Sequence, residues 1–341
     1  MKWYTQLLLF ALIIVACNSE KPREESTVKT GIFLEQGSIE VMDSRLAEVL
    51  DTSARLEILA EGFVWSEGPV WVAEHEMLLF SDIPPNTVYS WNEENGIRQF
   101  LKPSGYTGGD DREGEPGSNG LHLDDQGRLI LCQHGDRRLA RYTGTFEDPQ
   151  PSYETLADKY DGKRFNSPND AAVHSSGSIY FTDPPYGLEG RMDDPKKEIP
   201  FQGVYRLDAD GGVHLMVDSI TRPNGIAFSP DESKVYVASS DPEKAIWMEY
   251  EMQDGTFANG RLFYDVTSWV GKEKGLPDGL KVDDAGNLFA TGPGGVWIFA
   301  PDSTPLGLIR TGEATANCGF NDDKSVLFIT ADMYLLSLRL R

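Results

Sequence analysis

Oxygen-bearing side chains recur along this chain, each at or just before the start of a segment typical of a β-strand. They are Glu67, Asn119, Asn169, Asn224, Asp278 and Asn317, with spacings of 52, 50, 55, 54 and 39 residues. A period of about 40–50 residues indicates a propeller or a solenoid. If the repeats close into a ring, these carboxylates and amides converge on one axis. Converging oxygen ligands suit a hard cation such as calcium.

The repeats themselves predict the fold. Within the second repeat, four short β-type segments lie at residues 121–124, 128–133, 137–142 and 153–158, and turn residues separate them. Turns rich in Gly, Asp, Asn and Ser favour tight hairpins, so each repeat is expected to form four antiparallel strands. Six such repeats predict an all-β, six-bladed β-propeller. The last repeat has only three segments, and residues 56–62 (LEILAEG) are expected to supply its outer strand and close the ring.

Five linked motifs resemble the gluconolactonase branch of the family that includes regucalcin (senescence marker protein). They are EGPVW at 67–71, FNSPND at 165–170, YFTDPPYG at 180–187, RPNGIAFSPD at 222–231 and LPDGLKVD at 276–283. The resemblance runs in order from Glu61 to Thr330. It implies the same six-bladed propeller, with one divalent metal at its axis.

Carried over motif by motif, the resemblance implies a specific set of metal ligands. They are Glu67, Asn224 and Asp278, completed by Asn169 as in several family members. Asp278 corresponds to the proposed acid/base residue of the family. Calcium is the expected cofactor, with zinc or manganese as alternatives.

The expected substrate is a sugar lactone such as gluconolactone. The metal would polarise the lactone carbonyl, and Asp278 would take a proton from the attacking water. Residues expected to line the pocket are Asn119, His134, Asp183 and Tyr186, although His134 at a mouth loop has the alternative role of bonding a neighbouring loop. Asn317 is expected to be a hydrogen-bonded amide without a metal role. Arg164, a further substrate-contact candidate, departs from the regucalcin-like pattern because it stands five residues before Asn169 instead of two.

Two other functions use the same features. A channel metal also serves phosphotriester hydrolysis in related propellers, and a non-catalytic propeller of the cell envelope could bind calcium or sugar. Segments 102–118 and 187–200 are long, polar and rich in glycine or charge, which suits loops over the mouth.

The N-terminus predicts export. An apolar run from Leu7 to Ala16 is too short to span a bilayer and indicates a secretory signal over residues 1–16. The sequence before Cys17 resembles the lipobox of bacterial lipoproteins, which implies a lipid on Cys17. Residues 17–50 are then expected to be a flexible tether and residues 51–341 the propeller. This predicts a lipid-anchored protein of the bacterial cell envelope, periplasmic or surface-exposed, that meets the membrane only through its anchor.

The net charge limits the expected binding partners, and the cysteine positions predict the state of the thiols. The formal net charge of −23 repels nucleic acid and anionic lipid headgroups, so neither is an expected partner. Cys132 and Cys318 fall in different repeats and are expected to be buried free thiols.

Overall fold

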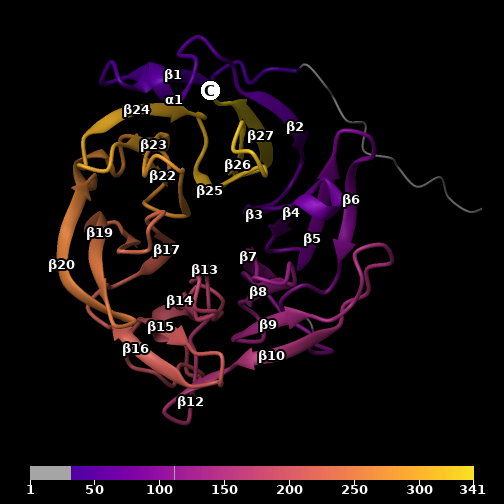
Figure 1. Ribbon diagram of the computed structural model, residues 1–341. Helices are drawn as coiled ribbons and strands as arrows, with labels where there is room; N and C mark the ends of the chain where they lie inside the picture. Colours follow the sequence, from indigo (N-terminus) through magenta and orange to yellow (C-terminus); the bar gives the residue numbers. More distant parts are fainter. Residues whose placement is uncertain (1–31, 111) are drawn as a thin grey trace, which may run out of the picture.

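Each repeat folds into one antiparallel blade, and six blades surround a common axis (Figure 1). The structure is a computed structural model and describes residues 32–110 and 112–341. The first three blades are β3 (Ser66–Val72), β4 (Met77–Asp82), β5 (Thr87–Asn92) and β6 (Gly96–Leu101); β7 (Ser118–Leu123), β8 (Leu129–Gln133), β9 (Arg138–Tyr142) and β10 (Tyr153–Ala157); and β13 (Ala171–Val173), β14 (Ile179–Asp183), β15 (Gly203–Leu207) and β16 (Val213–Val217). These bounds follow the predicted strands closely.

The remaining blades complete the ring. They are β17 (Pro223–Phe228), β18 (Lys234–Asp241), β19 (Lys244–Gln253) and β20 (Thr256–Asp265); β21 (Leu280–Val282), β22 (Leu288–Gly292), β23 (Gly295–Phe299) and β24 (Pro305–Arg310); and β25 (Thr315–Phe320), β26 (Val326–Ala331) and β27 (Tyr334–Arg339). Short additions are a β11 (Lys159–Tyr160) and β12 (Lys163–Arg164) ribbon and three 3₁₀ turns, η1 (Ala73–His75), η2 (Arg191–Asp193) and η3 (Thr267–Trp269). The predicted six-bladed β-propeller is confirmed.

An N-terminal strand closes the ring, as predicted. β2 (Glu57–Glu61) pairs antiparallel with β27 and forms the outer strand of blade 6. Blades 6 and 1 then pack through an apolar interface in which Trp71 stacks on Phe328 at a centroid distance of 5.6 Å. Pairing β27 on this side removes an unpaired strand edge, which protects the blade from pairing with another chain.

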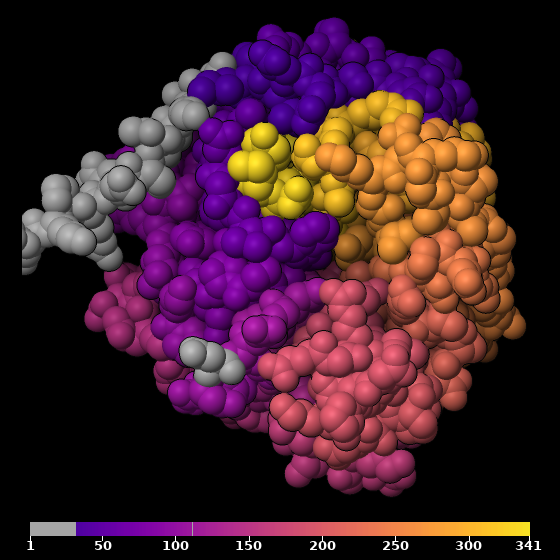
Figure 2. Space-filling view, turned by 180° about the vertical axis from the view of Figure 1, so that it is seen from behind, coloured from indigo at the N-terminus to yellow at the C-terminus, as the bar shows by residue number. Residues whose placement is uncertain are grey.

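The expected tether over residues 17–50 is wrong for its described part. β1 (Ser38–Val41) adds a fifth strand to blade 5 by pairing with β24, and the short helix α1 (Leu46–Val49) follows it. Leu46 and Leu50 are fully buried in the apolar core around blades 5 and 6. Figure 2 shows the indigo N-terminal residues lying along the rim beside the yellow and orange blades. The signal sequence and Cys17 lie outside the described residues.

The predicted thiols are confirmed: Cys132 and Cys318 are both buried and free. They lie in β8 and β25, on different blades. None of the helices among the described residues is long and apolar enough to cross a membrane.

The inner strands are irregular where the recurrent residues lie. The pairing of β3 with β4 shifts register between Glu67 and Val70, and that of β17 with β18 shifts between Pro223 and Ile226. Such interruptions re-aim side chains, and here they turn them toward the axis. A glycine follows Glu67, Asn119, Asn224 and Asp278, and it allows neighbouring blades to meet there. A Cβ on Gly68 would lie 2.3 Å from the Asn119 carbonyl oxygen, too close for any other residue.

Leu46→Ala tests whether the N-terminal segment belongs to the propeller. Removing a fully buried leucine side chain is expected to cost about 2–5 kcal/mol of unfolding free energy. Chemical denaturation followed by tryptophan fluorescence measures this loss. Val41→Ala, at a β1 position that is 51% exposed, is the matched control and should change stability little. Equal midpoints for Leu46→Ala and the unmutated protein would show that this segment contributes nothing to the fold.

Candidate active site

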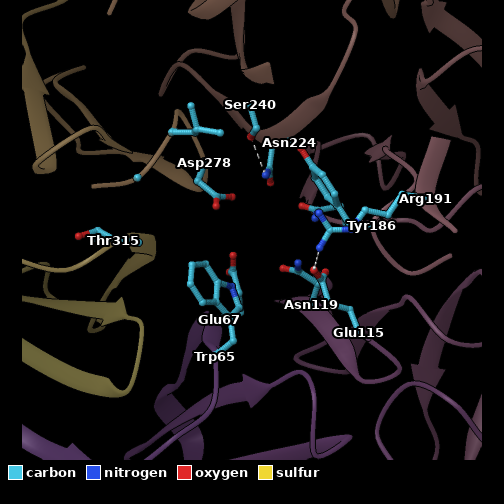
Figure 3. A pocket seen from close by; sticks show the side chains of 14 residues that line it. Trp65, Glu67, Glu115, Asn119, Tyr186, Arg191, Asn224, Ser240, Asp278 and Thr315 are labelled. Carbon is cyan, nitrogen blue, oxygen red and sulfur yellow. Dashed lines mark hydrogen bonds and ion pairs between the residues drawn. The ribbon is translucent and has the colours of Figure 1, made fainter. Parts of the chain in front are cut away.

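A cavity of about 440 Å³ opens at the mouth where the inner strands begin (Figure 3). Its walls come from all six blades and from the loops between strands. The lining residues are Trp65, Glu67, Glu115, Asn119, Asn169, Tyr186, Arg191, Asn224, Ser240, Gly275, Leu276, Asp278, Ala314 and Thr315. The fold therefore brings together residues that are more than two hundred positions apart in the sequence.

All four predicted metal ligands lie in this cavity. Glu67 in β3, Asn169 before β13, Asn224 in β17 and Asp278 before β21 come from four different blades. Glu67 and the two asparagines are buried, and Asp278 is partly buried. Four oxygen donors are thus gathered around one space, which is the type of donor set that hard cations prefer.

Several oxygen atoms in the cavity have no hydrogen-bond partner within the described part of the protein. They are the buried Asn119 Oδ1, Asn169 Oδ1 and Asp278 Oδ1. Buried polar atoms are usually hydrogen-bonded, so three unpartnered acceptors lining one cavity indicate a place for a cation or for donor groups of a ligand. Glu67 is different: its Oε2 accepts bonds from the Gly68 N–H at 2.7 Å and the Asn317 Nδ2 at 3.1 Å. Asn317 is therefore a satisfied amide, as predicted.

The carboxylates of the cavity are electrostatically strained. Burial raises the pKa of Glu67 to about 8, although the hydrogen bonds from Gly68 and Asn317 oppose this rise. Burial, and then the like charge of Glu67, raises the pKa of Asp278 well above its ordinary value. Like charges in a site of low polarity disfavour joint ionisation, and a cation between them reverses that effect.

Hydroxyl groups on the second strands fix the backbone of the site residues. Ser81 in β4 donates a 2.9 Å hydrogen bond to the Asn119 carbonyl, and Thr182 in β14 donates a 2.7 Å bond to the Asn224 carbonyl. In both cases the hydroxyl belongs to one blade and the acceptor to the next blade around the ring. Each such bond therefore ties a cavity residue to the neighbouring blade.

Two of the predicted substrate residues line the cavity. Asn119 is buried, and Tyr186 stands across the cavity from Glu67 (Figure 3). Burial, together with the charge of Asp278, raises the pKa of the Tyr186 hydroxyl, which therefore stays protonated and can donate a hydrogen bond.

The structure does not place the other three predicted substrate residues at the cavity. Asp183 is fully buried and accepts hydrogen bonds from the backbone N–H groups of Asn166 and Ser167, so it holds the loop that carries Asn169. Arg164 lies in β12 and donates to the Asp136 carbonyl. His134 is fully buried behind the cavity wall, where its Nε2 lies 3.4 Å from Asn169 Nδ2.

Sequence reasoning missed several cavity residues, above all Glu115 and Arg191. Arg191 Nη2 lies 3.5 Å from Glu115 Oε1, and this ion pair joins the loops 102–118 and 187–200 at the mouth (Figure 3). Loop composition predicted that these segments lie near the mouth, but no motif singled out either charge. Trp65 and Ser240 were also missed, although Trp65 stands only two residues before Glu67.

The match to known proteins agrees with this geometry. Residues 65–332 match the family described as SMP-30/Gluconolactonase/LRE-like region. The chain belongs to this family. It is 40% identical to a gluconolactonase of Zymomonas mobilis over 313 residues, 89% of this chain and 86% of the relative. It is 24% identical to a pentonolactonase of Haloferax volcanii over 84% of each chain. The solved structure of a Xanthomonas campestris gluconolactonase matches with a TM-score of 0.78 and 33% identity, over 91% of this chain and 97% of that one.

Asp183→Asn tests the structural role assigned to Asp183. An asparagine accepts only one of the two backbone N–H bonds, and its NH₂ group faces the other N–H. We expect a loss of about 1–3 kcal/mol in unfolding free energy, the usual cost of an unsatisfied buried donor. Thermal and chemical denaturation measure this loss. Asp218→Asn, at an exposed position, is the control. If Asp183→Asn left stability unchanged and raised KM, Asp183 would instead have a role in substrate binding.

Proposed function

We propose that this protein hydrolyses a sugar lactone with the help of a divalent cation bound by Glu67, Asn169, Asn224 and Asp278. The observation that carries the proposal is a set of three unpartnered buried oxygens, Asn119 Oδ1, Asn169 Oδ1 and Asp278 Oδ1, on residues that line one cavity together with Glu67 and Asn224. Membership of the family supports the reaction class, because relatives over most of the chain are named for lactone hydrolysis.

The donor set fits calcium better than zinc. All four proposed ligands are carboxylate or amide oxygens, and no histidine or cysteine of the described residues lines the cavity. Hard cations such as calcium prefer these donors, whereas zinc sites usually include imidazole or thiolate. When bound, such a cation would polarise the lactone carbonyl and stabilise negative charge on its oxygen.

The protein's own groups supply proton transfer and orientation. Asp278 has an unpartnered carboxylate oxygen and is the candidate base that removes a proton from the attacking water. Glu67 contributes negative charge that holds the cation. Asn119 and the protonated Tyr186 can bind hydroxyl groups of the sugar, and Trp65 offers an apolar wall for the ring.

Asp278→Asn separates proton transfer from cation binding. The amide keeps one oxygen but cannot accept a proton at neutral pH. If Asp278 is the base, kcat for gluconolactone should fall by about 10²–10⁴-fold while calcium binding, measured by titration calorimetry, persists. Full recovery of the rate with excess calcium would show that Asp278 is only a ligand. Asp218→Asn, at an exposed position, is the control and should keep full activity.

Glu67→Gln should show the opposite pattern. Losing a buried negative charge weakens the attraction for the cation, so calcium affinity should fall and added calcium should restore part of the rate. Chelation of the unmutated protein should abolish hydrolysis, and calcium should restore it better than zinc or manganese. Hydrolysis that persists after complete chelation would contradict a metal-assisted reaction.

The same titration, run on a panel of substrates, separates the two alternatives. Preferential hydrolysis of a phosphotriester would support the phosphotriesterase alternative. Calcium binding without turnover of any lactone would support a non-catalytic propeller that binds calcium or sugar.

Export and anchoring are a separate proposal that rests on the N-terminal sequence alone. We propose that Cys17 carries a lipid and holds the enzyme in the bacterial cell envelope, periplasmic or surface-exposed. The unmutated protein should then partition into detergent, whereas Cys17→Ala should yield soluble protein or an unprocessed precursor. Equal partitioning of the two proteins in Triton X-114 would contradict acylation.

A further inference from the structure

Two of the four proposed ligands are amides, whose ends have opposite character. The oxygen of an asparagine attracts a cation, whereas its NH₂ group repels one. A cation site that includes Asn169 and Asn224 therefore works only if both amides turn their Oδ1 atoms into the cavity. The orientation of the two amides decides whether a cation can bind, and its importance rests on the proposed function.

Ser240 accepts a hydrogen bond from the amide of Asn224. Ser240 lies near the end of β18, and its hydroxyl donates a 2.5 Å hydrogen bond to the Pro277 carbonyl. A hydroxyl has a single proton, so toward Asn224 it can only accept. Asn224 Nδ2 supplies that donor at 2.9 Å, and Figure 3 shows its Oδ1 on the side away from Ser240. The flipped amide would place two acceptor oxygens against each other.

His134 has the same relation to Asn169. Its Nε2 lies 3.4 Å from Asn169 Nδ2, and its Nδ1 lies 3.5 Å from a carboxylate oxygen of Glu115. Nδ1 makes no hydrogen bond among the described residues, and this nearby carboxylate is the acceptor that favours a proton on Nδ1 and leaves a lone pair on Nε2. That lone pair selects the NH₂ end of Asn169, so Oδ1 faces the cavity. Asn169 Oδ1 is indeed buried and has no partner among the described residues.

We propose that Ser240 and His134 are positioning residues that hold the amide oxygens of Asn224 and Asn169 toward the cation. Neither needs to touch the cation itself. Ser240 also bonds the carbonyl directly before Asp278, so it links two proposed ligands from adjacent blades. His134 lies between Asn169 and Glu115 of the mouth loop, which the Arg191 ion pair holds in turn.

Calcium affinity, measured by titration calorimetry on the purified folded protein, is the first test. Ser240→Ala and His134→Leu should each weaken calcium binding by about 10–100-fold, the usual effect of losing a group that orients a metal ligand. Ser240→Thr and His134→Gln keep an acceptor and should retain most of the affinity. Ser239→Ala is the matched control, since Ser239 is an adjacent buried serine of β18 whose hydroxyl has no partner within the described protein.

A double-mutant cycle distinguishes orientation from general structural damage. An aspartate has two equivalent oxygens, so Asn224→Asp removes the need to select one end. In that background Ser240→Ala should cost little calcium affinity, and His134→Leu should likewise cost little in Asn169→Asp. Equal losses in the asparagine and aspartate backgrounds would overturn the positioning role.

The outcomes also separate this inference from the proposed function. Failure of the unmutated protein to bind calcium, zinc or manganese would overturn the metal site itself. Tight calcium binding by the unmutated protein, with unchanged affinity in Ser240→Ala and His134→Leu, would overturn only the positioning of the amides. Thermal denaturation of each variant without calcium confirms that the protein being titrated is folded.

Discussion

The repulsion between two carboxylates in one cavity is the constraint on which the rest of the site depends. Glu67 and Asp278 come from opposite parts of the sequence, and burial raises the pKa of both. Nearby donors relieve this strain only in part, since Glu67 has two hydrogen bonds and one oxygen of Asp278 has none within the described protein. A divalent cation would favour ionisation of both groups, and the neutral amides beside them add ligands without adding charge. This balance fits a mouth where two carboxylates, Glu67 and Asp278, stand among four amides.

The propeller makes such a site possible because each blade contributes one short residue at the same height. Bonds between blades, such as those from Ser81 and Thr182, fix the backbone at these positions. Side chains behind the cavity wall then orient the amide groups of Asn224 and Asn169. Ser240 lies in the second strand of the blade that supplies Asn224, and His134 follows the second strand of the blade next to the one that supplies Asn169.

Much of the fold and part of the site could be predicted from the sequence. The regular recurrence of polar residues from Glu67 to Asn317 indicated a repeat, and the number of repeats predicted the number of blades. The last repeat lacks a strand, which predicted that β2 completes its blade. The tether was mispredicted because its polar residues outnumber the few leucines, such as Leu46, that anchor it. Asp183 and His134 lie outside the cavity lining, which the sequence could not show, because strand ends indicate which mouth a residue approaches but not whether its side chain enters the cavity or supports a loop. Glu115 and Arg191 are far apart in the sequence and come together only in the folded protein, so no local sequence pattern predicts their ion pair.

Anomalous scattering from crystals grown with manganese, and with calcium in parallel, locates the bound cation. We expect one strong peak in the cavity, with oxygens of Glu67, Asn169, Asn224 and Asp278 at distances of about 2.3–2.6 Å for calcium. Both amides should present Oδ1 to the ion. A peak elsewhere, such as beside His134 or Cys132, or a cavity without a peak at saturating metal, would contradict this cation site.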